Sequence, residues 1–336
     1  MITQIVSPSR EWLERAKEYV IAGDVVAFHT ETVYGLGANA FDDQAVQKIF
    51  ALKGRPADNP LIAHVHSEYD IRPLVDFVPD YAKMLRNAYL PGPLTMVYPS
   101  TGKVSPFVSC GLNTLAIRIP SSKTAQAFLK EVNLPIAAPS ANRSKHVSPV
   151  TAGHVYDDFK DEIPLILDGG ASEGGLESTV LDCTGEEPVI LREGLVTREM
   201  IVSVVGRCAV YEKKADEKPK SPGMAYQHYS PRCKTAYFTA EECDKAFELY
   251  HSEEAHGGKP YLLAESGLAD DLSRAGYNVL PLGKTGEEMA QKLYAQLRAA
   301  EGIATLLICV EPTLRGGVMA GVMNRLTRAF GRTESS

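Results

Sequence analysis

The sequence lacks the short signatures of several common enzyme classes. It contains no Gly-x-x-x-x-Gly-Lys, which excludes a Walker-type phosphate loop, and no Gly-x-Ser-x-Gly, which excludes the nucleophile elbow of α/β hydrolases. It also contains no His-Glu-x-x-His, the motif of one large class of zinc protease. The six cysteines include no Cys-x-x-Cys pair, the spacing of zinc ribbons. We therefore expect reduced thiols and no metal site made by protein ligands alone.

Membrane segments and strong charge are also missing. No apolar run approaches the ~20 residues that span a bilayer, and no cationic start is followed by an apolar core. We therefore expect a cytoplasmic protein with no membrane contact. Residues 1–207 carry 19 Lys and Arg against 25 Asp and Glu, and residues 208–336 carry 16 against 17. Neither part has the cationic excess of a general nucleic-acid binder, so any RNA would have to bind to a local patch.

A chain of 336 residues is longer than one typical domain, and its pattern predicts two domains of unequal size. Residues 1–207 read as a large mixed α/β domain, with capped helices at 9–22 and 42–53 among others. Its apolar, strand-like runs lie at 25–28, 61–65, 94–98, 115–119, 135–138, 165–167, 178–181 and 189–191.

A second pattern begins after a charged stretch without core residues, Lys213–Lys220. We expect a linker over 208–233 and a small Rossmann-like domain over 234–336. Strands at 235–238, 260–264, 277–282 and 304–310 alternate there with helices at 240–250, 267–275, 285–300 and 317–329. Such alternation is typical of a doubly wound, mostly parallel sheet.

One motif is misleading. Gly35-Leu-Gly-Ala-Asn-Ala40 fits the dinucleotide fingerprint, but that fingerprint must turn directly from a strand into a helix. Six residues, Thr30 to Gly35, lie after the preceding strand, and the next helix begins only near Asp42. We therefore do not expect a dehydrogenase.

Two short segments instead suggest an anion site. Lys53 and Arg55 follow a helix, and Ser140 and Asn142 follow an apolar strand. Arginine forks and lysine ammonium groups bind phosphate or carboxylate oxygens, and hydroxyl and amide groups fix orientation. Either segment alone is more often a solvated loop or a helix cap, so the prediction depends on the combination.

Arg118 lies inside the apolar strand Leu115–Ile119, where a buried guanidinium needs an anion or a carboxylate. Glu31 and Glu177 are possible carboxylate partners. The alternative is an edge strand with Arg118 pointing to water. His64, taken alone, would be read as a structural histidine.

Five motifs occur in order along the first domain: Thr30–Gly37, Lys53–Pro56 with Asn59-Pro60, Pro91–Thr95, Ala138–Asn142 and Ser148–Ala152. They closely resemble the YrdC-like domain of threonylcarbamoyl-adenylate synthases. Ser221–Pro231 resembles the linker of the longer, two-domain members, so the resemblance covers essentially the whole chain. It implies a large, twisted mixed sheet with helices, followed by the linker and the Rossmann-like domain.

The resemblance also implies the reaction. Such enzymes make L-threonylcarbamoyl-AMP and pyrophosphate from L-threonine, bicarbonate and ATP, for the threonylcarbamoyladenosine modification of tRNA beside the anticodon. Transfer proteins and tRNA would then be indirect partners. Mg²⁺ would accompany ATP, held by phosphate oxygens and water, without a tight protein site. The threonine carbamate is itself the nucleophile, so no activated Ser, Cys or His is needed, and catalysis would come from positioning and positive charge.

The site residues implied by the resemblance fall into two sets. Threonine would be held by Thr32, His64, Arg118 and Ser178, with Ala138 acting through its backbone. ATP would be held by Arg55, Asn59, Thr114, Ser140, Asn142, Ser148, Arg192 and Tyr229. Lys53 and Arg55 would have the catalytic role.

Two segments depart from the family pattern, and a third is predicted to act as a lid. Arg192-Glu-Gly194 stands where Arg-Pro-Gly is expected, and Ser121-Ser-Lys123 replaces a His-Pro pair common in the family. The aromatic segment Ser221–Pro231 would close over ATP through Tyr229 and exclude water from a labile adenylate.

There are two alternative functions. One is an RNA-binding module of the same fold without adenylate synthesis. The other is a carbamoyl-phosphate-using transferase like the hydrogenase maturation proteins, which is disfavoured because their zinc-finger and acylphosphatase segments are absent from the sequence.

Overall fold

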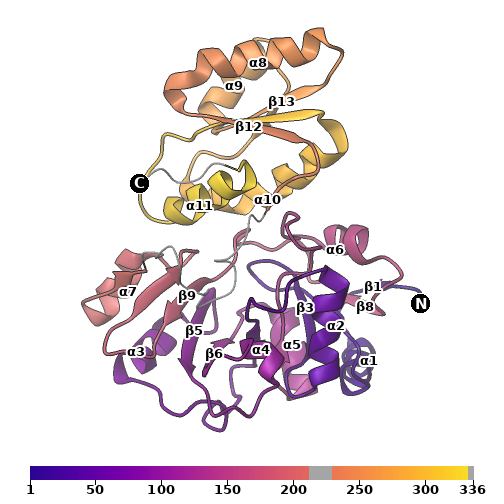
Figure 1. Ribbon diagram of the computed structural model, residues 1–336, viewed down its shortest axis with the longest axis vertical. Coiled ribbons are helices and arrows are strands. Elements are labelled where there is room, and N and C mark those ends of the chain that lie inside the picture. Colours follow the sequence, from indigo (N-terminus) through magenta and orange to yellow (C-terminus); the bar gives the residue numbers. More distant parts are fainter. Residues whose placement is uncertain (212–228, 332–336) are drawn as a thin grey trace. The chain divides into compact units, whose positions relative to one another are not determined.

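The computed structural model describes residues 1–211 and 229–331, which form two compact units (Figure 1). Of these, residues 1–144 and 148–211 form the first unit, and residues 145–147 and 229–331 form the second. Most of the predicted linker, 208–233, lies outside the described residues, so its boundaries remain predictions.

In the described part of the first unit, one mixed sheet has 11 strands in the order β1-β8-β2-β3-β7-β4-β6-β5-β9-β10-β11. The strands are β1 (Gln4–Val6), β2 (Val26–Phe28), β3 (Gly35–Asn39), β4 (Ile62–His64), β5 (Leu94–Pro99), β6 (Thr114–Arg118), β7 (Ile136–Ala137), β8 (Leu165–Leu167), β9 (Thr179–Asp182), β10 (Val189–Arg192) and β11 (Ala209–Val210). At its centre β6 is parallel to β4 and antiparallel to β5, which is parallel to β9. The predicted mixed sheet is confirmed.

The helices of this unit cover both faces of the sheet. They are α1 (Arg10–Ile21), α2 (Asp43–Lys53), α3 (Asp80–Tyr89), α4 (Pro106–Ser109), α5 (Lys123–Val132), α6 (Ala152–Phe159) and α7 (Arg198–Val205). Helices α1 and α5 pack on Val26 and Phe28 of β2, and the larger core, which includes Ala27, lies on the opposite face. This alternation along β2 is what a strand with two buried faces requires.

Local signals set the helix ends where the sequence predicts them. The Ser9 hydroxyl accepts a hydrogen bond from Trp12 N at the start of α1. Asp42 caps α2 in the same way, and Gly54 ends α2 with a left-handed φ of 60°. This fixed end places Lys53 and Arg55 on either side of the helix terminus.

The glycine-rich segment that fits the dinucleotide fingerprint forms a strand. Gly35–Asn39 forms β3, which pairs antiparallel with β2 and leads into no helix directly. A Cβ on Gly37 would lie 2.7 Å from Ile136 Cγ2 and 2.8 Å from the Phe28 ring. These glycines therefore serve close packing, which agrees with our rejection of a dehydrogenase.

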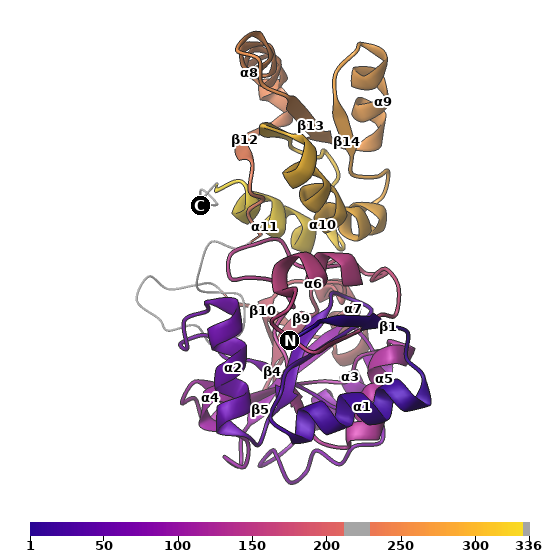
Figure 2. The same cartoon turned by 90° about the vertical axis from the view of Figure 1, so that its right-hand side faces the viewer.

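The second unit is a small, all-parallel sheet in the order β12-β15-β13-β14, as predicted. Its elements are β12 (Lys234–Phe238), the 3₁₀ turn η1 (Ala240–Glu242), α8 (Cys243–Ala255), β13 (Pro260–Ala264), α9 (Ser266–Arg274), β14 (Val279–Pro281), α10 (Gly286–Ile303), β15 (Leu306–Val310) and α11 (Met319–Ala329). Helices α8 and α9 cover one face and α10 and α11 the other, as both views show (Figures 1 and 2). Among the described helices of both units, none is long and apolar enough to cross a membrane.

Candidate functional site

The five neighbouring strands β4, β6, β5, β9 and β10 carry an unusual face. On the side away from the large core they form an apolar patch, which consists of Ile62, Val97, Ala116, Val180 and Leu191. Polar side chains lie two positions from the patch on its same side, two positions after Ile62 and Ala116 and two positions before Val97 and Val180. We call these four the polar row: His64, Thr95, Arg118 and Ser178. Three of them belong to the predicted threonine set, and the structure brings them together.

Arg118 is at the centre of the polar row. It lies on an inner strand, opposite both His64 of β4 and Thr95 of β5, and is only 4% exposed. Its Nη2 donates to Glu31 Oε1 over 2.7 Å. The alternative of an edge strand with Arg118 in water is therefore wrong. Of the two candidate partners, Glu31 takes the guanidinium, whereas Glu177 accepts from the Ser148 hydroxyl over 2.6 Å.

His64 is neutral at physiological pH. Burial, and secondarily the charge of Arg118, lowers its pKa to about 3. Its Nδ1 lies 3.1 Å from the Ile62 carbonyl oxygen, and its ring packs edge-on against Phe28. A neutral imidazole here offers a hydrogen bond without a second positive charge beside Arg118.

The hydroxyl members join the polar row to β10. The Thr95 and Ser178 hydroxyl oxygens are 2.7 Å apart. Arg192 Nη2 donates to the Ser178 carbonyl oxygen over 2.8 Å. A β-bulge precedes Arg192, and bulges commonly redirect a side chain next to a site. An arginine from the predicted ATP set thus contacts a residue from the predicted threonine set.

Thr32 lies in the loop after β2, next to Glu31, which is bonded to Arg118 of the polar row. It is fully buried, with its hydroxyl 3.0 Å from that of Thr30. Ala138 follows β7, and its N–H donates to the Ile62 carbonyl oxygen over 2.9 Å. Ala138 is therefore bonded to Ile62, the first residue of β4.

Lys53 joins the two signature segments. Its Nζ donates to the carbonyl oxygens of Ser140 and Asn142 over 2.6 Å and 2.5 Å, and its side chain is buried. Ser140 also forms an isolated antiparallel bridge with Gly35. The predicted combination of the Lys-x-Arg and Ser-x-Asn segments is therefore present in the fold.

Arg55, Asn59 and Thr114 lie near the beginnings of β4 and β6. Arg55 Nη2 donates to the Asn59 and Pro60 carbonyl oxygens. Asn59 is 1% exposed, and in the described part of the chain both polar atoms of its amide lack a hydrogen-bond partner. Such a buried, unsatisfied amide is costly, and a polar ligand or water would relieve that cost.

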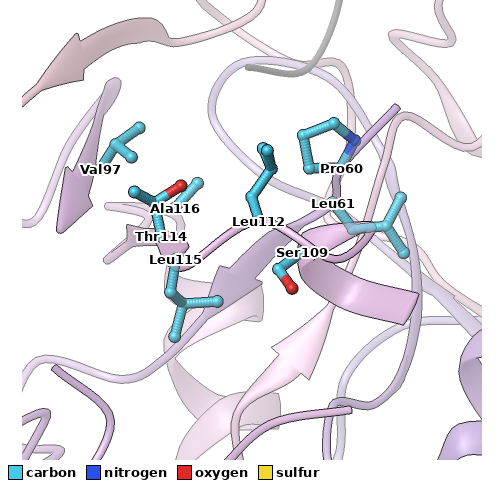
Figure 3. Close-up of a pocket in the computed structure, with 8 residues that line it drawn as sticks. All are labelled: Pro60, Leu61, Val97, Ser109, Leu112, Thr114, Leu115 and Ala116. Carbon is cyan, nitrogen blue, oxygen red and sulfur yellow. The ribbon is translucent and has the colours of Figure 1, made fainter. Parts of the chain in front are cut away.

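Thr114 lines a small pocket of about 10 Å³ together with Pro60, Leu61 and Ser109 (Figure 3). This volume suits roughly one water molecule. Thr114 stands four residues before Arg118 on β6, so the two side chains share a face and are separated by about 13 Å. The predicted ATP set therefore extends well beyond the polar row.

Tyr229 belongs to the second unit. It is 5% exposed, and its ring stacks on Tyr294 of α10 with the centroids 5.3 Å apart. The Arg325 guanidinium lies 6.0 Å from the centre of the same ring. Residues 221–228 of the predicted lid lie outside the described residues, so the lid remains a prediction.

The two departures from the family pattern have structural surroundings. Gly194 remains necessary, because a Cβ there would lie 2.5 Å from the Glu177 carbonyl oxygen. At the other departure, the Ser121 and Ser122 backbone N–H groups donate to Glu31 Oε2 over 3.0 Å and 3.4 Å. The sequence reading did not predict Thr95 as a site residue, although it lies inside the quoted motif Pro91–Thr95.

A metal centre is not evident in residues 1–211 and 229–331, where no group of three or more His, Cys, Asp or Glu side chains could hold an ion. Of the charged side chains described above in the first unit, Lys53, Arg55, Arg118 and Arg192 are cationic, and Glu31 and Glu177 are anionic. This donor set suits phosphate and carboxylate oxygens.

Known proteins resemble the chain over both units. Residues 18–194 match the family described as "Telomere recombination", and residues 196–331 match "Threonylcarbamoyl-AMP synthase, C-terminal domain". The threonylcarbamoyl-AMP synthase of Pyrococcus abyssi is 40% identical over 328 residues, which are 96% of this chain and 95% of its own. That of Bacillus subtilis is 39% identical over 335 residues, 98% of this chain and 96% of its own.

A solved structure is similar over the same length. The crystal structure of P. abyssi Sua5 complexed with L-threonine has a TM-score of 0.88 to this chain at 37% identity. The match covers 98% of each chain.

Proposed function

The chain belongs to the threonylcarbamoyl-AMP synthase family, and we propose that it forms L-threonylcarbamoyl-AMP and pyrophosphate from L-threonine, bicarbonate and ATP on the polar row and its surroundings. It is thus a nucleotidyltransferase whose product serves tRNA modification. The observation that carries the site assignment is the buried Arg118, with neutral His64 and two hydroxyl groups beside an apolar patch. A cation for a carboxylate and an apolar surface for a methyl group are what a small amino acid requires.

In this proposal threonine lies at the Arg118 end of the face. Thr32, His64, Arg118 and Ser178 bind it, and Ala138 contributes its backbone. P. abyssi Sua5 was crystallised with L-threonine, which supports the ligand. Thr95, bonded to the Ser178 hydroxyl, joins this set.

ATP would bind to the other residues of the predicted site. Arg55, Asn59 and Thr114 lie at the far end of the face, and Arg192 contacts Ser178, so only an extended ligand would reach all of them. Ser140, Asn142 and Ser148 complete the ATP set. Tyr229 is the remaining member of the predicted ATP set.

The reaction needs positioning more than an activated side chain. The threonine amine attacks the carbon of bicarbonate, and water leaves to give a carbamate. A carbamate oxygen then attacks the α-phosphorus of ATP, the bond to the β-phosphate oxygen breaks, and pyrophosphate departs. Lys53 and Arg55 would place positive charge near the developing negative charge, and Lys53 also fixes the Ser140 and Asn142 carbonyl groups.

Mg²⁺ would arrive with ATP. The charged groups named above are mainly cationic, so the ion would be bound by phosphate oxygens and water and would screen phosphate charge. Bicarbonate, the transfer proteins that accept the adenylate, and a cytoplasmic location remain predictions.

Pyrophosphate release tests this function. Purified protein with ATP, L-threonine, bicarbonate and Mg²⁺ should release pyrophosphate, and omission of threonine or of bicarbonate should abolish the release. Equal release without threonine would contradict the proposal. Salt-dependent tRNA binding without pyrophosphate release would favour the RNA-binding alternative, which full-length similarity to synthases does not favour.

A further inference from the structure

Glu31 has an unusually complete set of partners. Its side chain is 14% exposed, and its Oε1 accepts from Arg118 Nη2 over 2.7 Å. Its Oε2 accepts from the backbone N–H groups of Ser121 and Ser122 over 3.0 Å and 3.4 Å. One carboxylate therefore connects the loop after β2, the end of β6 and the start of α5.

The loop that carries Glu31 is itself fixed. The Glu31 carbonyl oxygen accepts from Gly174 N over 2.7 Å, and the Ser172 hydroxyl donates to the Thr30 carbonyl oxygen over 2.9 Å. Gly174 permits this approach, since a Cβ there would lie 2.9 Å from the Glu31 carbonyl oxygen. The backbone of Glu31 is thus held independently of its side chain.

The start of α5 is fixed from the other side. The Ser122 hydroxyl caps the helix through Ala125 N and lies 2.7 Å from His29 Nδ1. His29 is buried, and burial lowers the pKa of its ring. The two N–H groups that meet Glu31 therefore have defined positions.

The orientation of the Arg118 guanidinium depends on Glu31. Its Nη2 is bonded to Glu31, while its Nε is buried and has no hydrogen-bond partner in the described part of the chain. Glu31 is therefore the hydrogen-bond partner that fixes the plane of the guanidinium in the described part of the chain, and without Glu31 only packing would orient it. A bidentate interaction with a carboxylate ligand requires the opposite, a fixed fork.

We propose that Glu31 is the positioning residue that orients Arg118 toward the carboxylate of threonine. The inference depends on the proposed function, because it takes Arg118 to be the threonine-binding arginine. The competing role is simple charge compensation, in which Glu31 only neutralises Arg118 and repels the ligand. The two roles predict opposite signs: loss of Glu31 weakens threonine binding if Glu31 positions Arg118, and strengthens it if Glu31 only compensates charge.

Two variants separate these roles. Glu31→Gln keeps the size and removes the charge, and Glu31→Asp keeps the charge but shortens the reach by one methylene. If Glu31 positions Arg118, both variants should raise the KM and the calorimetric Kd for L-threonine, by at least tenfold for Glu31→Gln. The KM for ATP should change less than twofold. Glu68→Gln is the matched control, because Glu68 also pairs with a cation, Lys130, but is 70% exposed.

The outcomes are distinct. Unchanged or tighter threonine binding in Glu31→Gln, or full activity in Glu31→Asp, would overturn the positioning role. Equal losses for threonine and ATP with a lowered Tm would show a merely structural residue and also overturn it. Wild-type protein that neither binds threonine nor releases pyrophosphate with it would overturn the proposed function, and the inference with it. If the activity of the wild-type protein depends on threonine, the proposed function holds, and the variants then test only the role of Glu31.

Discussion

At the scale of single residues, the two arginines that we propose for different substrates differ in burial. Arg118 is almost fully buried on an inner strand, and Arg55 is half-buried on a loop, where it donates to main-chain carbonyl groups. Arg55 is bonded to residues that precede β4, and Arg118 lies opposite His64, the last residue of β4, so we expect each arginine to affect one substrate.

We predict that Arg118→Ala weakens threonine binding and Arg55→Ala weakens ATP binding. A lost charge-assisted hydrogen bond costs about 1.5–3 kcal/mol, or roughly 10-fold to 150-fold in Kd. Isothermal titration with each substrate separates the two effects. Arg72→Ala is the control, because Arg72 pairs with Asp70 on the surface and is 85% exposed. Unchanged threonine affinity in Arg118→Ala would mean that the arginine is structural.

The sequence identified Arg118 because a charge interrupts an apolar strand, but it left two candidate partners. The choice of Glu31 could not be made from the sequence, because the pair joins residues 87 positions apart through the strand order of the sheet. Thr95 was missed for another reason. A threonine inside a strand is also an ordinary β-former, so its hydroxyl gave no distinct signal.

At the scale of helices and strands, local chemistry was sufficient for most boundaries. Ser9, Asp42 and Gly54 predicted the ends of α1 and α2 because capping acts within one turn. β3 was missed because Gly35–Asn39 reads as a loop, and its glycines matter only where Phe28 and Ile136 approach. The pairing of β1 with β8 could not be predicted either, since it joins Gln4 to Leu165.

The C-terminal end of α2 is bonded to the segment 140–142 of the proposed site. Lys53, the last residue of α2, binds the Ser140 and Asn142 carbonyl oxygens from a buried position. We predict that Lys53→Met lowers the unfolding free energy by about 1–3 kcal/mol, because a buried and a part-buried carbonyl group lose their donor. ATP affinity should fall as well, since the segment 140–142 loses its anchor. Denaturant unfolding and ATP titration measure the two effects.

Lys48→Met is the matched control on the same helix. Lys48 donates to the Gly23 carbonyl oxygen and to Asp24, but its side chain is 50% exposed. Lys48→Met should change the unfolding free energy by at most about 1 kcal/mol. If both methionine variants behave alike, Lys53 is an ordinary helix-terminal lysine and the anchor role is incorrect.

At the scale of the whole molecule, the chain consists of a first unit, to which we assign the proposed site, and a Rossmann-like second unit that carries Tyr229. The family match covers both units, although every other residue of the proposed site belongs to the first. Tyr229 is therefore the residue through which the second unit would take part in the reaction. Its stacking on Tyr294 gives it a second possible role, as a packing residue of its own unit.

Paired variants distinguish the ATP role from the packing role. Tyr229→Ala should weaken ATP binding by roughly tenfold, equivalent to ~1.4 kcal/mol, and increase escape of the adenylate if Tyr229 closes over the nucleotide. Tyr294→Leu removes the stacking partner but leaves Tyr229 in the chain, so it should disturb ATP binding much less. ATP titration, Tm and product analysis on both variants give the comparison. If Tyr229 only packs against α10, the two variants will lower the Tm alike and leave ATP affinity unchanged, and the predicted lid has no part in the reaction.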